Sequence, residues 1–170
     1  MAHGVVRTDL MIGTRVEACL HHVKYMVDGA NNTSTPTAID NGNVLKLSGM
    51  LSREVWKGVT PAANTSVENL VLVATPELIY DERVHNIDEF FNEAGDVLRC
   101  YTLHRHDIFS VTADALDAAA EIAVGDIVEA QASTKLKVVK SATNGSAKVG
   151  KVVAIETKGR YTYYVIQIND

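Results

Sequence analysis

Alternating apolar and polar positions run through most of the chain, and they predict short strands joined by tight turns. Alternation of this kind places one face of a strand in a core and the other in solvent. The alternation is clearest in residues 135–140, and strands are also predicted for residues 126–130, 151–157 and 161–168. We therefore expect the last forty residues to form a small antiparallel meander.

Two glycine-containing pairs predict the turns of this meander. Asn144-Gly145 is typical of a type I′ hairpin turn, which requires positive φ at both central positions. Lys158-Gly159 is predicted to turn the third strand into the fourth. Residues 161–168 are apolar or aromatic on both faces, and such a strand is usually central in its sheet or covered on both sides.

The middle of the chain is also rich in predicted strands, and it holds two short helical pieces. Asn86 with Glu89 three residues later is typical of a helix N-terminus. The alanine-rich residues 114–123 could form one or two further turns. Strands are predicted for residues 43–48, 54–57, 70–74, 97–103 and 108–112.

The first thirty-eight residues have a different pattern. Residues 28–38 are a polar loop or linker. Residues 15–27 fit either a helix or a strand, and we expect them to belong to an extended arm. The predicted fold is thus mostly β, with small antiparallel barrel or sandwich modules, an N-terminal arm and one or two short helices. Three divisions are predicted: an arm and linker (residues 1–38), a central β-rich region (39–112) and a C-terminal meander (113–170). The last two are expected to pack as one unit.

Charge is divided unevenly along the chain, although the net charge is only −5. Residues 131–170 carry seven Lys or Arg against two acids, whereas the preceding residues carry nine against nineteen. Such a split allows one end to meet an acidic partner, or like molecules to associate head to tail. No run of about 18 apolar residues occurs, so no membrane span is predicted, and the start of the chain lacks the pattern of a secretory signal.

The residues best suited to metal or nucleophilic chemistry surround His104 and His106. On a strand these two side chains would share a face, and His85 or Asp107 could complete a zinc site for a metal-dependent enzyme. A polar turn at a strand end accounts for the same residues, and we favour that interpretation. The adjacent histidines at 21 and 22 would point apart.

The cysteines do not indicate a catalytic thiol. Cys19 and Cys100 lie far apart in the sequence without metal-type spacing, and reduced thiols are the expectation. Cys100 and His104 would lie about 13 Å apart on a strand, too far for a nucleophile and its base. Phosphate-binding glycine loops and nucleophile-elbow motifs are absent from the sequence. We expect no cofactor and no enzymatic activity.

The basic C-terminal region leaves a second function open. Tyr161, Tyr163 and Tyr164 near several lysines could form a platform on which bases stack and phosphates are neutralised. On a strand, however, at most two of the three tyrosines share a face. A nucleic-acid-binding small β-barrel is therefore an alternative and not the main expectation.

Two stretches of the chain resemble bacteriophage head decoration proteins, also called capsid cement proteins. The first comprises residues 39–47, 70–77 and 80–83, and the second comprises residues 124–130, 150–156 and 159–166. The resemblance lies in the style and order of these segments. It implies a small β module without cofactor or catalytic residues that binds the outer surface of an assembled icosahedral shell.

The resemblance also implies partners and a location. The partners would be the major capsid protein and copies of this chain, with a trimer as one arrangement. The protein would be made in the host cytoplasm and reside on the capsid exterior, without membrane or nucleic acid. The N-terminal segment resembles arms that such proteins lay across neighbouring subunits. Candidate partner-binding residues are Arg7, Met11, Arg15, Tyr25 and Trp56, although for Trp56 core packing is the first interpretation and an interface anchor the second.

Overall fold

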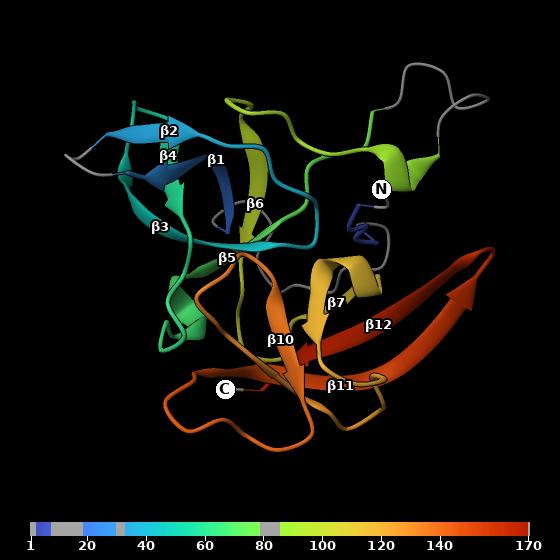
Figure 1. Cartoon of the computed structure of the whole chain (residues 1–170). Coiled ribbons are helices and arrows are strands. Elements are labelled where there is room, and N and C mark those ends of the chain that lie inside the picture. Colours follow the sequence, from blue (N-terminus) through green and yellow to red (C-terminus); the bar gives the residue numbers. More distant parts are fainter. Residues whose placement is uncertain (1–2, 8–18, 30–32, 79–85, 170) are drawn as a thin grey trace.

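The structure is a computed structural model, and it describes residues 3–7, 19–29, 33–78 and 86–169 (Figure 1). Strands dominate it, which confirms the predicted mostly β class. No helix within these residues is long and apolar enough to cross a membrane. The strands form two six-stranded sheets, one from each half of the chain.

The first sheet closes into a barrel. Its order is β2-β1-β4-β3-β5-β6, and a further pairing of β1 with β6 closes a five-stranded ring. Strand β1 runs parallel to β4 and antiparallel to β6. The short β2 pairs only with the far end of β1. The bounds are β1 (Leu20–Asp28), β2 (Ser34–Pro36), β3 (Val44–Met50), β4 (Val55–Val59), β5 (Leu70–Val73) and β6 (Leu98–Thr102).

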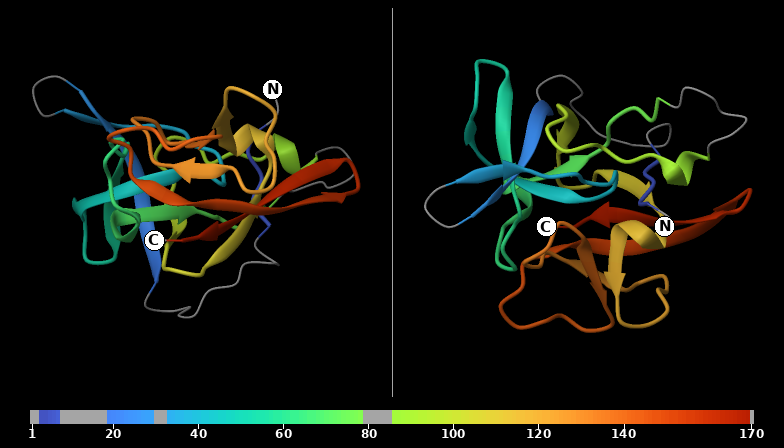
Figure 2. Two further views of the ribbon diagram at one scale, coloured as in Figure 1. Left: turned by 90° about the horizontal axis from the view of Figure 1, so that it is seen from below. Right: turned by 45° about the horizontal axis from the view of Figure 1, so that its top comes forward.

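The second sheet curls into a half-barrel with the order β7-β12-β11-β9-β10-β8. Its longest hairpin, β11–β12, projects from the body in both figures (red in Figures 1 and 2). Strands β8 and β10 are parallel, whereas the other pairs are antiparallel. The bounds are β7 (Ile108–Val111), β8 (Leu116–Ala118), β9 (Ile127–Glu129), β10 (Leu136–Val139), β11 (Lys148–Lys158) and β12 (Tyr161–Ile168).

Strand β5 joins the two sheets into one packed unit because both of its faces are buried. Val71 and Val73 point into the barrel interior, where they pack with Leu98 and other apolar residues. Leu70 and Leu72 point the other way, into a core shared with the second sheet. Successive side chains of a strand alternate between faces, so a continuous apolar run suits this position.

The strands predicted from the sequence are confirmed in both halves. Strand β12 lies between β7 and β11, as its two-faced apolar pattern indicated. Gly159, with φ +62°, turns β11 into β12 as expected. The 3₁₀ helix η4 (Ile87–Glu89) begins at Asn86 with the predicted capping box.

The predicted hairpin at Asn144-Gly145 is wrong. The pair does form a turn, closed by the Ser146 N–H donating to the Thr143 carbonyl at 3.2 Å. Only Gly145 has positive φ, at +85°, so the turn is not type I′. Strand β9 lies between β10 and β11 and pairs with both, so the turn connects strands that are not neighbours.

Three further expectations need correction. The parallel pairs β1–β4 and β8–β10 depart from an all-antiparallel arrangement. Residues 20–28 are not an arm, because β1 is hydrogen-bonded into the barrel between β4 and β6. The alanine-rich segment 114–123 does not continue as a helix. It gives only the 3₁₀ helix η5 (Ala113–Ala115) before β8; a third such helix is η3 (Val67–Asn69).

The division at residue 112 also shifts, since β7 belongs to the second sheet. The chain passes from one sheet to the other between β6 and β7. A shared core then explains why the two sheets pack as one body.

Candidate interaction surface

Residues 3–7 lie along the free edge of β7 and add to the second sheet. Val6 forms an antiparallel bridge with Val111. The Arg7 N–H donates to the Ser110 carbonyl at 2.9 Å, and the Thr112 N–H donates to the Val5 carbonyl at 3.0 Å. Val5 and Val6 are almost fully buried. This segment of the predicted arm is thus held on the body by main-chain hydrogen bonds and apolar burial.

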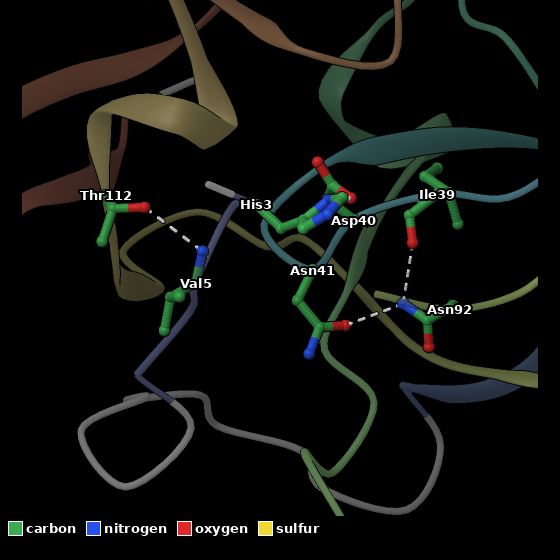
Figure 3. A network of polar contacts seen from close by, with 7 residues as sticks. All are labelled: His3, Val5, Ile39, Asp40, Asn41, Asn92 and Thr112. Atoms are coloured by element: carbon green, nitrogen blue, oxygen red, sulfur yellow. Dashed lines mark hydrogen bonds and ion pairs between the residues drawn. The ribbon is translucent and has the colours of Figure 1, made fainter. Parts of the chain in front are cut away.

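A polar network fixes the beginning of this segment (Figure 3). The Nδ1 atom of His3 lies 2.8 Å from Asp40 Oδ1, and its ring stacks on Phe91 at 4.9 Å between centroids. Beside this pair, Asn92 Nδ2 donates to the Ile39 carbonyl and to Asn41 Oδ1. Asn41 and Asn92 are both buried, and a hydrogen-bonded buried amide specifies a single local arrangement.

Val5, Val6 and Arg7 also form one wall of a groove of about 460 Å³ at the β11–β12 hairpin. The described residues that line the groove include three cations, two tyrosines and one carboxylate, with apolar contributions from Val5, Val6 and Ile87. The polar members are Arg7, Lys158, Arg160, Tyr161, Tyr163 and Glu77. A smaller cavity of about 280 Å³ lies beside it and shares Val5, Arg160 and Tyr161.

Arginine–tyrosine stacks order the charged side of the groove. The Arg7 guanidinium lies over the Tyr163 ring at 5.4 Å, and that of Arg160 lies over the Tyr161 ring at 4.9 Å. Asp88 ties the second stack to η4, because it pairs with Arg160 and accepts a hydrogen bond from the Tyr161 hydroxyl at 3.0 Å. Arg7 also pairs with Glu156 on β11 at 3.7 Å.

The carboxyl group of Glu77 is half-buried in the same groove. Burial raises its pKa above the ordinary value, while a hydrogen bond from Asn41 Nδ2 at 3.3 Å acts in the opposite direction. Glu77 therefore connects the groove to the buried asparagines Asn41 and Asn92.

The predicted partner-binding residues do not form one surface. Arg7 lies in the groove, whereas Tyr25 is buried in the barrel core with its hydroxyl 2.9 Å from Thr60 Oγ1. Trp56 is half-buried against that same core, edge-on to His21. Burial lowers the pKa of His21. Met11 and Arg15 lie outside the described residues.

Sequence patterns did not single out Glu77 or Arg160 as site residues. The available signal was the mixture of basic and aromatic residues in 158–163. That signal does not reveal the other wall of the groove, because residues 3–7 reach the hairpin only through tertiary packing.

The histidine cluster at residues 104–107 forms a strand-entry turn. The Asp107 carboxylate accepts a hydrogen bond from the His104 N–H at 2.8 Å, and His106 adopts positive φ, +73°. The same turn precedes β6 and β9, where Asp96 and Asp126 accept from residues 93 and 123 and glycines occupy the positive-φ position. Local backbone geometry thus accounts for this motif.

No metal centre forms around these histidines within the described residues, where no group of three His, Cys, Asp or Glu is suited to hold an ion. His85 lies outside them. The residue that meets His104 is Cys19, whose Sγ lies 3.7 Å from Nδ1. The same Nδ1 faces Asp107 at 3.8 Å, whereas a relay of thiol, imidazole and carboxylate uses the two ring nitrogens separately.

Cys100 is separate from this pair. It is a free thiol in the barrel core, and burial raises its pKa. Thiolate is the nucleophilic form of cysteine, so its surroundings oppose reactivity.

The tyrosines proposed as a base-stacking platform divide between two faces of β12. Tyr161 and Tyr163 lie together, 6.2 Å apart, with an arginine over one face of each ring. Tyr164 packs against the core shared by the two sheets. Of the three tyrosines, Tyr161 and Tyr163 therefore share a face, and an arginine stacks on each of them.

The fold and this groove define the chain as a mostly β protein of two packed sheets that carries a charged, tyrosine-lined groove. No protein-family model, curated protein or solved structure matches it.

Proposed function

We propose that this chain is a non-enzymatic structural protein of a phage virion, which binds the outer surface of the assembled capsid. There it would stabilise the shell by bridging neighbouring capsid subunits. The sequence resemblance to head decoration proteins motivates the proposal. The structural observation that supports it best is the groove of arginine–tyrosine stacks beside the projecting β11–β12 hairpin.

The composition and order of this groove suit contact with a protein. Arginine and tyrosine are enriched in protein interfaces and among the residues that contribute most to binding. Arg160 and Tyr161 are held against Asp88 before any partner arrives. Side chains ordered in advance lose less conformational entropy on binding, so more of the contact energy contributes to affinity.

The proposal assigns the major capsid protein as the partner of this groove. Copies of this chain, for example in a trimer, would provide further contacts. The protein would be made in the host cytoplasm and reside on the capsid exterior.

Cosedimentation with capsids assembled without this protein tests the proposal. Wild-type protein is expected to pellet with the shells. A double variant, Lys158→Ala with Arg160→Ala, is expected to bind about tenfold more weakly or worse, because it removes two of the three cations that the described part of the groove contains. Lys46→Ala is the matched control, since Lys46 is exposed on β3 of the barrel.

The possible outcomes test the capsid-binding function and the role of the groove separately. Failure of wild-type protein to bind shells would reject the capsid proposal. Equal binding by wild type and the double variant would retain the capsid role and reject the groove as its contact. Circular dichroism should show the same β content for each variant, because both replaced side chains are exposed.

A further inference from the structure

The chain contains two Asn-Gly pairs, and the structure places them in opposite environments. An asparagine followed by glycine is chemically labile, because the backbone nitrogen of the next residue can attack the side-chain amide carbon. Glycine has no Cβ to hinder this approach. The pairs are Asn41-Gly42 and Asn144-Gly145.

Asn144 lies in an exposed loop. Residues 141–145 are all exposed, and a Cβ added at Gly145 would meet no atom within 4 Å. The Thr143–Ser146 hydrogen bond closes the turn without holding the Asn144 side chain. Rotation of this side chain toward the Gly145 nitrogen therefore requires no repacking.

At Asn41-Gly42, hydrogen bonds hold both reacting groups, the Asn41 side-chain amide and the Gly42 backbone nitrogen. Its side chain is fully buried, with Nδ2 donating to the Thr75 carbonyl at 2.8 Å and Oδ1 accepting from the Thr75 N–H at 3.1 Å. Asn92 donates a further hydrogen bond to Oδ1. The attacking nitrogen, that of Gly42, donates its proton to the Val73 carbonyl at 2.8 Å. Reaction here would require breaking this network.

We propose that Asn144 is a site of spontaneous deamidation in the folded protein, and that Asn41 is protected by the fold. The Gly145 nitrogen bonds to the Asn144 side-chain carbon, and the bond from that carbon to Nδ2 breaks. The amide nitrogen leaves as ammonia with the proton from Gly145. Water then opens the resulting succinimide at either carbonyl and leaves aspartate or isoaspartate.

The modification would reach a buried strand through the neighbouring residue. The Thr143 N–H donates to Oε1 of Glu129 at 2.7 Å, and Glu129 on β9 is only 1% exposed. The other carboxylate oxygen, Oε2, is buried and has no hydrogen-bond partner among the residues that the structure describes. An isoaspartate lengthens the backbone directly after Thr143. This change would displace the Thr143 N–H from the buried Glu129 carboxylate and weaken their hydrogen bond.

Incubation of the intact folded protein at mildly alkaline pH, followed by peptide mass spectrometry, tests the inference. Asn144 is expected to deamidate at least about tenfold faster than Asn41, because only its reacting atoms can reach attack geometry. In urea, where neither pair is held, the two rates should approach each other. Asn144→Gln is the control variant, since the longer side chain disfavours the cyclic intermediate.

Each outcome decides the matter. A rate at Asn144 that exceeds the rate at Asn41 only in the folded protein supports the inference. Similar rates in the folded protein would overturn it. The inference would also be overturned if Asn144 did not react in the folded protein while both Asn-Gly pairs reacted in urea.

Discussion

The turns that precede β6, β7 and β9 contain the same type of hydrogen bond at three different levels of burial. In each turn an aspartate accepts a hydrogen bond from the backbone N–H three residues earlier. Asp96 is exposed, the side chain of Asp107 is 14% exposed, and that of Asp126 is 9% exposed. Replacing each by alanine removes this hydrogen bond in different surroundings, and at Asp126 it also removes the contact with Lys140.

The expected cost follows the burial. Asp126 accepts from the Ala123 N–H at 2.8 Å and from Lys140 Nζ at 2.7 Å. A hydrogen bond to a charged group contributes about 1.5–3 kcal/mol, whereas a pair with the exposed Lys140 adds at most about 1 kcal/mol. Asp126→Ala should therefore lower the free energy of unfolding by about 2–3 kcal/mol. Asp107→Ala should cost less, and Asp96→Ala should cost about 0.5 kcal/mol.

The cost at Asp126 should also depend on pH. Hydrogen bonds from Lys140 and then from the Ala123 backbone hold the pKa of Asp126 below its ordinary value. A depressed pKa stabilises the folded state above the unfolded-state pKa, and this stability is lost as pH falls through the folded-state pKa. The difference between wild type and Asp126→Ala is thus expected in full near neutral pH and to shrink below about pH 4.

Urea unfolding followed by the fluorescence of the single tryptophan, Trp56, measures these differences. Midpoints should shift at constant slope, because the surface exposed on unfolding is unchanged. Equal costs at the three aspartates, or the largest cost at Asp96, would refute the burial argument. An Asp126→Ala difference that is undiminished in acid would refute the assignment to the ionised carboxylate.

Two further substitutions test how the second sheet is assembled. Gly150→Ala should cost about 3 kcal/mol in thermal or urea unfolding, because its Cβ would lie 2.2 Å from the Gln167 carbonyl oxygen. Gly49→Ala is the control and should leave stability nearly unchanged, because a Cβ there would meet no atom within 4 Å. Equal losses of stability in the two variants would contradict the steric explanation. Val6→Asp should release residues 3–7 and speed hydrogen exchange at the Thr112 amide, which bonds to the Val5 carbonyl. Unchanged exchange there, with the β11–β12 amides as reference, would show that the segment stays bound.

Much of the secondary structure could be predicted from local patterns. Strand β12 is apolar on both faces, a pattern that favours a central position in a sheet that is covered on both sides. The capping box of Asn86 and Glu89 involves residues only three apart, so its signal is contained in the sequence. The β11–β12 turn is likewise local.

The candidate site could be predicted only in part. Arg7 was singled out, but its stacking partner Tyr163 lies more than 150 residues later in the chain. Tyr25 and Trp56 were proposed for a partner because aromatic residues suit interfaces as well as cores. The barrel encloses Tyr25 and packs Trp56 against its core, and no property of either residue type alone distinguishes these two roles.

The sequence by itself determined which segments are strands, because alternation, turn residues and caps act over a few neighbouring positions. Tertiary structure decided which strands are neighbours. Asn144-Gly145 illustrates the division: the pair specifies a turn, but β9 lies between the strands that it was expected to join. Residues 20–28 have strand character in either an arm or a barrel, and pairing with β4 and β6 places them in the barrel. Strand order depends on burying apolar faces from distant segments together, and this energy is not encoded in any single local pattern.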